Sequence, residues 1–298
     1  MTTQSNKKNI YVAWSNKQDS YSFIATIKTI EEIGCNPVIL KMVKSNDVIY
    51  EGDDLNPSMI DEHGILLSEY AKKVKEYSWR HSNIEEITKD VDCVIFPGGS
   101  DICPTLYKVE EGWHGLKDDT DYSASRDISD YILMSYCLDK DIPMFAICRG
   151  MQMLAVVSGG SIISDIPTYF SLLNKNENAV HRDINRIRFV PHDVDVTDKD
   201  SLFYRIIEQD VLKNTPSWHH QGILSVENTL LTSTGEYTYA GVKIMEVIER
   251  KDLSFCIGVQ FHPEVAVRMH IEGSFDKDRF TDYESTLSFF KALKNFKK

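Results

Sequence analysis

A cysteine at the end of an apolar run is the residue of this sequence best placed for nucleophilic chemistry. The run Phe145–Ile147 leads directly into Cys148, which predicts a buried strand followed at once by a helix. Its neighbours two positions away are Ala146 and Gly150, and a sharp strand-to-helix turn requires such small residues. N–H groups at the helix start would favour the reactive thiolate. A buried structural cysteine is the alternative, and both interpretations remain open at this point.

A histidine and a glutamate near the C-terminus could complete such a site. In His262-Pro263-Glu264 the proline keeps His262 extended, and residues two apart along a strand point to the same side. The carboxylate could then hold the imidazole tautomer, which would give a nucleophile, a base and an orienting residue together with Cys148. An ordinary polar strand end is the alternative interpretation.

Two glycines after another apolar run could supply an oxyanion hole. The segment Phe96–Asp101 contains Gly98 and Gly99 at the end of a predicted strand. Glycines let backbone amides approach a substrate closely, so an amide of this segment and that of Arg149 could bind a developing negative charge. A plain turn is the alternative for this motif taken alone.

Alternating apolar runs and helical spacings predict the elements that would hold these groups. Strand, helix and strand patterns follow one another over 10–40, which is the βαβ unit of a parallel sheet. Further strands are predicted over 91–96, 142–147, 186–190, 243–249 and 255–261, and further helices over 66–79, 128–138, 151–157 and the C-terminal end. We expect one α/β domain over 1–298, with a largely parallel central sheet and helices on both faces. No function is assigned to 45–90.

The charge balance excludes two classes of partner. The 298 residues contain 33 Lys and Arg against 45 Asp and Glu, a net charge of −12. Surfaces that bind nucleic-acid phosphates or anionic membranes need clustered basic residues. The four lysines near the C-terminus accompany an apolar helical face, which indicates an amphipathic helix with a solvated side. We expect no nucleic acid and no membrane as partners.

The N-terminus and the cysteines point to a cytoplasmic protein. No apolar run is long enough for a signal peptide or a membrane span. The six cysteines form no Cys-x-x-Cys pair, so we expect neither a disulfide framework nor a zinc ribbon. They are Cys35, Cys93, Cys103, Cys137, Cys148 and Cys256.

Taken together, the three candidate segments resemble the class I glutamine amidotransferase-like family. In that family a cysteine in the pattern Cys-x-Gly-x-Gln follows a strand, and a His-x-Glu lies near the C-terminus. The matching positions here are Cys148, Gly150 and Gln152, then His262 and Glu264. The resemblance implies a flavodoxin-like α/β fold with a nucleophile elbow at a strand end.

The closer resemblance is to the gamma-glutamyl-gamma-aminobutyrate hydrolase branch of this family, and it runs from about Val91 to Glu264. Pro216 stands where the branch commonly has Asn, and 45–90 follows no pattern of the branch. Both could border the substrate entrance. The matching segments are Gly98–Tyr107, Arg126-Asp127, Ile147–Gln152, Gly159-Gly160, Asp165–Pro167, His181-Arg182, Ser217–Gln221 and Gly258–Glu264.

The resemblance implies hydrolysis of a gamma-glutamyl amide by a Cys-His-Glu triad. Cys148 would attack the carbonyl, His262 would protonate the leaving amine, and water would release glutamate from a thioester. No metal or organic cofactor is implied, although His219 and His220 with nearby acids could be imagined as metal ligands. The implied oxyanion amides are those of Gly99 and Arg149, and the implied substrate-binding residues are Gly98, Gln152, His219, His220 and Gln221.

Three functions are compatible with these residues. The first is a hydrolase of a small gamma-glutamyl amine, such as gamma-glutamyl-gamma-aminobutyrate in putrescine breakdown. The second is a glutaminase subunit that supplies ammonia to a separate synthetase. The third is a non-catalytic binding protein on the same fold, against which the intact Cys148, His262 and Glu264 argue. The expected partner is a small gamma-glutamyl molecule, with a homodimer as a further option.

Overall fold

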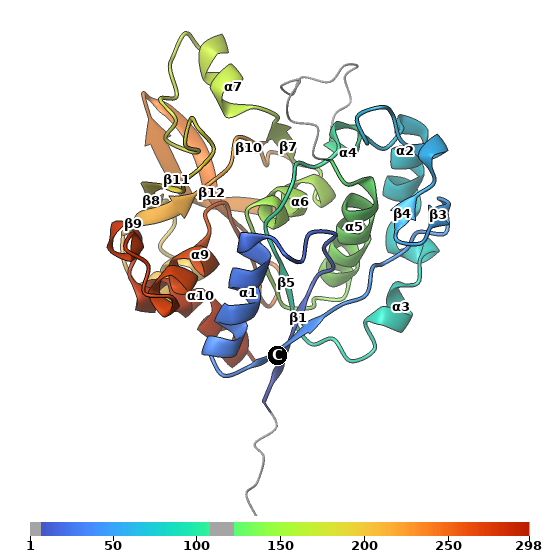
Figure 1. Ribbon diagram of the computed structural model, residues 1–298, viewed down its shortest axis with the longest axis horizontal. Coiled ribbons are helices and arrows are strands. Elements are labelled where there is room, and N and C mark those ends of the chain that lie inside the picture. The colour runs from blue at the N-terminus through green and yellow to red at the C-terminus, as the bar shows by residue number, and fades with distance from the viewer. Residues whose placement is uncertain (1–6, 108–121, 298) are drawn as a thin grey trace, which may run out of the picture.

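A mixed β-sheet runs through the centre of the computed structural model, which describes residues 7–107 and 122–297 (Figure 1). Five strands at one side of the sheet are parallel, in the order β2-β1-β5-β6-β13. This arrangement confirms the expected largely parallel centre of a flavodoxin-like sheet. The five strands are β1 (Asn9–Val12), β2 (Asn36–Ile39), β5 (Val94–Phe96), β6 (Met144–Ile147) and β13 (Cys256–Val259).

Antiparallel strands extend the sheet beyond β13. The order continues β12-β11-β8-β9, and a short pair, β10 and β7, joins through β12. A separate hairpin consists of β3 (Tyr50–Glu51) and β4 (Asp54–Leu55). The extending strands are β7 (Ser161–Ile163), β8 (Val190–Val196), β9 (Val211–Ser217), β10 (Gly222–Ser225), β11 (Leu231–Tyr239) and β12 (Val242–Arg250).

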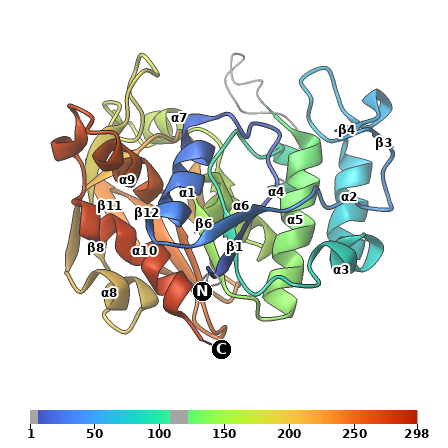
Figure 2. The same cartoon turned by 60° about the horizontal axis from the view of Figure 1, so that its bottom comes forward.

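Helices cover both faces of the parallel strands, because alternate residues of these buried strands point to opposite sides. Ile147 and its same-face neighbours pack against α1 (Tyr21–Glu32), α9 (Pro263–Ile271) and α10 (Tyr283–Asn295). Ala146 and its neighbours pack against α5 (Ala124–Asp139) and α6 (Arg149–Val157). Figures 1 and 2 both show α1, α9 and α10 grouped together and away from α5.

The segment 45–90, which the sequence left without a role, covers the α5 side of the molecule. Its Leu66, Val74 and Ile84 are buried in the same core as α5 and α6. The remaining helices of the described residues are α2 (Ser68–Tyr77), α3 (Ile84–Ile87), α4 (Pro104–Tyr107), α7 (Ile166–Leu172) and α8 (Leu202–Ile207), with 3₁₀ turns at Pro57–Met59, Ser78–His81 and Lys277–Arg279.

One predicted strand is wrong. The segment 186–190 was expected to be extended, but β8 begins only at Val190 and the residues before it form an irregular turn. Arg186 lies at φ +54, and its amide donates to the carbonyl of Asp183. Arg186, Ile187 and Arg188 are all exposed, so the apolar alternation has no core to face, and the periodicity alone was misleading.

The register of the parallel strands brings three loops to one edge of the sheet. Phe96 is opposite Ala146, and Ile147 is opposite Val259. The residues that follow β5, β6 and β13 are the glycine segment, Cys148 and the segment leading to His262. Open α/β sheets bind ligands beyond the carboxyl ends of their parallel strands, and here all three predicted catalytic segments meet there.

Residues 1–6, over which no signal peptide was expected, and Lys298 lie outside the described residues. Within 7–107 and 122–297 no helix is long and apolar enough to cross a membrane. The assignment of 1–298 to one domain stays a prediction.

Candidate active site

Cys148 sits at a strained turn between β6 and α6. It has φ +50 and ψ −106, a backbone region that residues other than glycine rarely occupy and that costs about 1–3 kcal/mol. Its amide is held by the carbonyl of Val259 at 2.7 Å. A Cβ on Gly150 would come within 2.4 Å of the Phe96 carbonyl oxygen. The sharp turn therefore requires glycine at 150, as the spacing predicted.

His262 and Glu264 meet as expected, but by a different route. The strand β13 ends at Val259, His262 is the N-cap residue of α9, and Glu264 lies in the first turn of that helix. The prediction that both project from one strand is therefore wrong. The helix start still brings His262 Nδ1 within 2.7 Å of Glu264 Oε1. Ser22 donates a second hydrogen bond to this carboxylate oxygen, at 2.6 Å, which fixes its position.

The charge on His262 is set by its two neighbours. Burial by itself would lower the pKa of His262, but the Glu264 carboxylate and the Cys148 sulfur outweigh it and raise the pKa to about 10. At neutral pH the imidazole therefore carries two protons, one directed at Glu264 and one available toward the sulfur. A positive imidazolium beside a cysteine favours the thiolate form.

The glycine segment after β5 is clamped by Arg126. The Arg126 guanidinium donates to the carbonyls of Pro97 and Gly98, at 3.1 and 2.9 Å. A Cβ on Gly99 would lie 2.0 Å from Arg126 Nη1, and one on Gly98 would lie 2.8 Å from His262 Cε1. Side chains at 98 or 99 would collide with the Arg126 clamp or with the His262 imidazole unless these groups moved, so glycine fits both positions best.

The Arg149 side chain turns away from the pocket into a buried ion-pair cluster. It contacts Asp127 and Asp130, both on α5, and Arg126 lies 3.5 Å from Asp130. All four side chains are at most 2% exposed. Burial opposes the charge of Arg149, but the two carboxylates raise its pKa. The cluster joins α5 to the first residue of α6, so it holds the elbow and the glycine segment in one unit.

Two glutamines form a buried hydrogen-bonded path to the nucleophile. Gln260 Nε2 donates to Cys148 Sγ at 3.4 Å, and Gln152 Nε2 donates to Gln260 Oε1 at 3.2 Å. Gln152 also donates to the Gln221 carbonyl at 3.1 Å, and this carbonyl lies 2.8 Å from His219 Nδ1. The sulfur is thus contacted by a positioned amide as well as by the imidazole.

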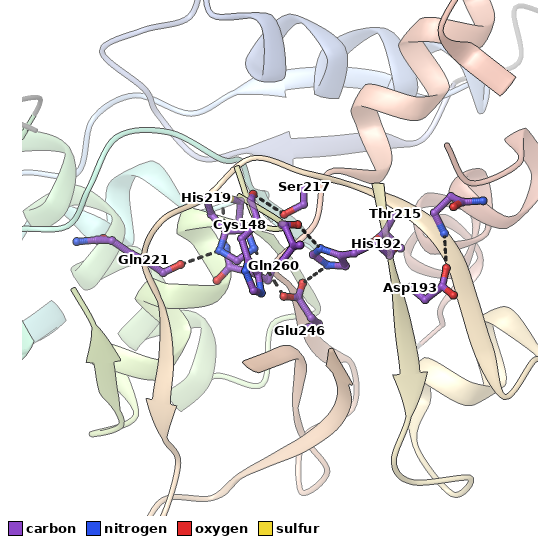
Figure 3. A network of polar contacts seen from close by, with 12 residues as sticks. Cys148, His192, Asp193, Thr215, Ser217, His219, Gln221, Glu246 and Gln260 are labelled. Atoms are coloured by element: carbon purple, nitrogen blue, oxygen red, sulfur yellow. Dashed lines mark hydrogen bonds and ion pairs between the residues drawn. The ribbon is translucent and has the colours of Figure 1, made fainter. Parts of the chain in front are cut away.

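A buried glutamate anchors the far end of this path (Figure 3). Glu246 is fully buried on β12, with His192 Nε2 at 3.3 Å and His219 Nε2 at 3.6 Å. Burial alone would raise the pKa of Glu246, but the two imidazoles lower it well below its usual value. The predicted substrate residue His219 is therefore oriented through Nδ1 by the Gln221 carbonyl, and its Nε2 faces the Glu246 carboxylate.

His220 is held between two carboxylates. Its Nδ1 lies 3.1 Å from Asp165 and its Nε2 lies 2.9 Å from Asp101. Burial by itself would lower the pKa of His220, but these two partners raise it to about 9. Asp165 also caps α7 by accepting from the amide of Thr168. Because His220 bridges α7 to the glycine segment, its main contacts are within the protein wall.

A pocket of 790 Å³ opens above Cys148, and most of the predicted site residues line it. Gly98, Arg149 and Glu264 are not among the lining residues; the Arg149 side chain is held in a buried ion pair, and Glu264 is hydrogen-bonded to His262. The predicted residues that do line the pocket are Gly99, Cys148, Gln152, His219, His220, Gln221 and His262.

Pro216, which departs from the branch pattern, fits its place in the sheet. Pro216 lies on β9, the last strand of the sheet, where the missing N–H of proline is tolerated. Its carbonyl accepts from the His262 amide at 2.8 Å, a bond that does not depend on the side chain at 216. Ser217 follows it and donates to the carbonyl of His181.

Three contributors to the site were not recognised from the sequence. Gln260 stands two positions before His262, within the matched segment Gly258–Glu264. The sequence therefore indicated that it lies near the site but did not indicate its contact with Cys148. Ser22 and Asp130 carry no motif signal, because each reaches the site only through the packing of its helix.

Among the described residues, no group of three or more His, Cys, Asp and Glu side chains is arranged to hold a metal ion. The two histidines considered as ligands from the sequence point to different partners. His219 faces Glu246, whereas His220 bridges Asp101 and Asp165.

Iodoacetamide is expected to alkylate Cys148 well before the other five cysteines. All six are free and buried, but Cys148 lines the pocket beside His262. Burial raises the pKa of every other thiol, to about 12 for Cys93 and Cys256. Peptide mapping after brief labelling at neutral pH shows which cysteines are alkylated first. Equal labelling of Cys148 and Cys93 would contradict the proposed activation.

Replacing Gln260 with leucine is expected to slow the alkylation of Cys148 by about tenfold to a hundredfold, because a hydrogen bond to a charged group contributes about 1.5–3 kcal/mol. Gln260→Leu keeps the side-chain volume, and its melting temperature shows whether the fold survives. An unchanged alkylation rate in a folded variant would show that the Gln260 amide does not stabilise the reactive sulfur.

The sequence is similar to a family of cysteine peptidases and to several curated proteins. Residues 77–264 match the sequence model of the peptidase C26 family. Protein NtpR of Enterococcus hirae is 33% identical over 191 residues, which cover 64% of this chain and 72% of NtpR. The gamma-glutamyl-gamma-aminobutyrate hydrolase PuuD of Escherichia coli is 28% identical over 189 residues, which cover 61% of this chain and 68% of PuuD.

Solved structures confirm the fold. The glutaminase domain of Trypanosoma brucei CTPS superposes with a TM-score of 0.53 at 14% identity, over 98% of this chain and 95% of that one. PurLQS from Thermotoga maritima gives a TM-score of 0.53 at 13% identity, over 98% of this chain and 100% of that one. The comparisons confirm the glutamine amidotransferase-like resemblance and the α/β fold that it implied.

Proposed function

The chain belongs to the peptidase C26 family, and from this premise we propose that it is a cysteine-dependent hydrolase of small gamma-glutamyl amides. Hydrolysis of amide bonds is the coarse activity that the family and its relatives support. The observation that carries the finer proposal is the elbow: Cys148, at φ +50, lies on the floor of a pocket beside the His262–Glu264 pair.

The acylation step uses the charge state of the pair. The Cys148 sulfur attacks the side-chain carbonyl carbon of the gamma-glutamyl group, and a C–S bond forms. His262 gives its proton to the amide nitrogen as the C–N bond breaks, so the leaving group departs as a neutral amine. Glu264, held by Ser22, keeps the imidazole oriented throughout.

The negative oxygen of the tetrahedral intermediate needs donors at fixed positions. We assign this role to the amides of Gly99 and Arg149. The buried cluster behind them fixes both segments: Arg126 clamps the carbonyls beside Gly99, and the Arg149 side chain is bound to Asp127. Donors that are already in place cost no reorganisation during the reaction.

The deacylation step reverses the proton transfer. After the amine leaves, His262 is neutral and can take a proton from water. The hydroxide adds to the thioester carbonyl, the C–S bond breaks, and glutamate is released with the thiolate restored. The net reaction consumes one water and yields glutamate and an amine.

Recognition of the glutamyl part is assigned to the inner wall of the pocket. The Gln152 amide nitrogen is used by the Gln221 carbonyl and by Gln260. The Gln152 oxygen is therefore the group that remains to accept from the substrate's α-ammonium. His219, His220 and Gln221 line the adjoining wall, and their buried partners hold them in place.

The test is a comparison of three amides with glutamate release as the readout. We expect gamma-glutamyl-gamma-aminobutyrate to be hydrolysed with a higher kcat/KM than glutamine, because its longer leaving group can contact the outer wall of the pocket. The α-glutamyl isomer of the same compound is the matched control. It should not react, since its scissile carbonyl would lie away from Cys148.

Two outcomes would overturn the proposal. Release of glutamate from glutamine alone, and only after a synthetase is added, would favour the glutaminase subunit. Absence of hydrolysis of every gamma-glutamyl compound by folded protein would favour a non-catalytic binding role.

A further inference from the structure

An aromatic cluster continues the pocket outward from His262. The ring of Phe189 lies 5.3 Å from the imidazole of His262, and the ring of Trp218 lies 5.3 Å from Phe189. Tyr21 completes the cluster, 6.4 Å from Phe189. Because His262 must reach the leaving nitrogen, the group attached to that nitrogen begins beside Phe189.

The three rings present partly exposed faces to the pocket. Tyr21 is 40% exposed, Phe189 and Trp218 are half-buried, and all three line the cavity. Tyr21 is held from its other side by the Arg268 guanidinium, 3.9 Å from the ring centroid. Preplaced aromatic faces stabilise apolar or aromatic ligand groups at a small entropic cost.

Among the described residues that line the pocket, basic side chains outnumber acidic ones. The wall holds five basic side chains against two acidic ones, Asp101 and Asp276, in a chain whose net charge is −12. Asp101 faces His220, and Asp276 is paired with one of the five, Arg279, at 3.3 Å. A cleft lined by one sign of charge concentrates ligands of the other sign. The five are Lys17, Arg182, Arg186, Arg188 and Arg279.

The same short segment carries both the charge and the ring. Arg188 directly precedes Phe189, Arg186 stands three positions before it, and both arginines line the pocket. The segment turns at Asp183, whose carboxylate accepts from the Ile187 amide at 3.2 Å. The glutamyl end of any substrate is a zwitterion with no net charge, so it does not by itself account for this excess of basic residues.

We infer that the leaving group is an amino acid with a large apolar or aromatic side chain, its carboxylate facing Arg188 and its side chain on the Phe189–Trp218–Tyr21 cluster. The inference rests on the proposed function and narrows it to gamma-glutamyl amino acids. A cationic leaving group such as a polyamine is disfavoured, because Arg188, next to Phe189 in the pocket lining, would repel it.

Four substrates separate the contribution of the leaving group's aromatic ring from that of its carboxylate. Gamma-glutamylphenylalanine has both the ring and the carboxylate, gamma-glutamylphenethylamine has only the ring, gamma-glutamylglycine has only the carboxylate, and gamma-glutamylputrescine carries a positive charge instead. We expect kcat/KM to be highest for the first and about tenfold or more lower for the last. Added salt should narrow the difference between phenylalanine and phenethylamine, because exposed charges are screened.

Arg188→Glu tests the charge, with Lys72→Glu on the exposed side of α2 as the matched control. Arg188→Glu should lower the ratio of kcat/KM for gamma-glutamylphenylalanine to that for gamma-glutamylputrescine by about tenfold, whereas Lys72→Glu should leave it unchanged. Phe189→Ala should lower the ratio of kcat/KM for gamma-glutamylphenylalanine to that for gamma-glutamylglycine. Because both kcat/KM values of a ratio come from the same variant, a general loss of catalytic activity cancels.

The proposed hydrolase function and the inference about the leaving group can be contradicted by different results. If none of the four compounds releases glutamate, the proposed function is wrong. If they react but putrescine is as good a leaving group as phenylalanine, or if both charge reversals change the ratio equally, the inference about the leaving group is wrong and the hydrolase proposal stands.

Discussion

Replacing Cys148 with alanine is expected to lower glutamate release from gamma-glutamyl amides by at least about a thousandfold, because no other group in the pocket can form the thioester. The fold should survive. The Cys148 side chain accepts a hydrogen bond from Gln260 and lies beside His262, and the elbow is held by backbone contacts and by the cluster around Arg149. Activity is measured with gamma-glutamyl-gamma-aminobutyrate and folding by thermal melting.

Cys137→Ala is the matched control, because Cys137 is fully buried on α5 and outside the pocket. It should retain activity. A Cys148→Gly variant tests the strain itself: glycine tolerates φ +50, so this variant should melt at a higher temperature than Cys148→Ala. Full activity in Cys148→Ala would contradict the mechanism, and a lower melting temperature for the glycine variant would contradict the strain.

Replacing Arg149 with leucine is expected to lower the free energy of unfolding by about 3–5 kcal/mol, since breaking a buried ion pair leaves uncompensated charge. Asp127 and Asp130 are both at most 1% exposed, so neither carboxylate can recover its hydration in the folded state. The expected fall in Tm is roughly 5–8 °C for a chain of this size. Chemical denaturation and thermal melting measure the two quantities.

Two further variants separate charge from packing. Adding Asp127→Asn to Arg149→Leu should recover part of the lost stability, because it removes the unpaired carboxylate and leaves Asp130 to pair with Arg126. Arg205→Leu, on the exposed side of α8, should change the stability by no more than about 0.5 kcal/mol. An Arg149→Leu protein as stable as the parent would show that the cluster does not hold the elbow.

The elbow could be predicted because its requirements are local. A buried run, a cysteine and a glycine two residues later specify the turn, and the clash of a Cβ at Gly150 with the Phe96 carbonyl shows why. The parallel strands could be predicted for the same reason, since strands buried on both faces are continuous apolar runs.

The partners from distant elements could not be predicted. Ser22 reaches Glu264 across 242 positions of the sequence, and Asp130 meets Arg149 only because α5 packs beside α6. The antiparallel strands β9 and β11 are rich in polar and β-branched residues without a clear alternation, so periodicity gave no signal there. The turn at 182–189 alternates apolar and polar residues, but its apolar side chains do not pack against a core, so the alternation did not indicate a strand there.

The thioester on Cys148 is tested most directly by measuring the mass of the enzyme during turnover. Rapid acid quenching of the protein with gamma-glutamyl-gamma-aminobutyrate, followed by digestion and mass spectrometry, should show a peptide containing Cys148 heavier by one glutamyl group. The adduct should disappear as substrate is consumed and should be absent from Cys148→Ala. Turnover with no adduct on Cys148, or with the adduct on another residue, would contradict the thioester mechanism.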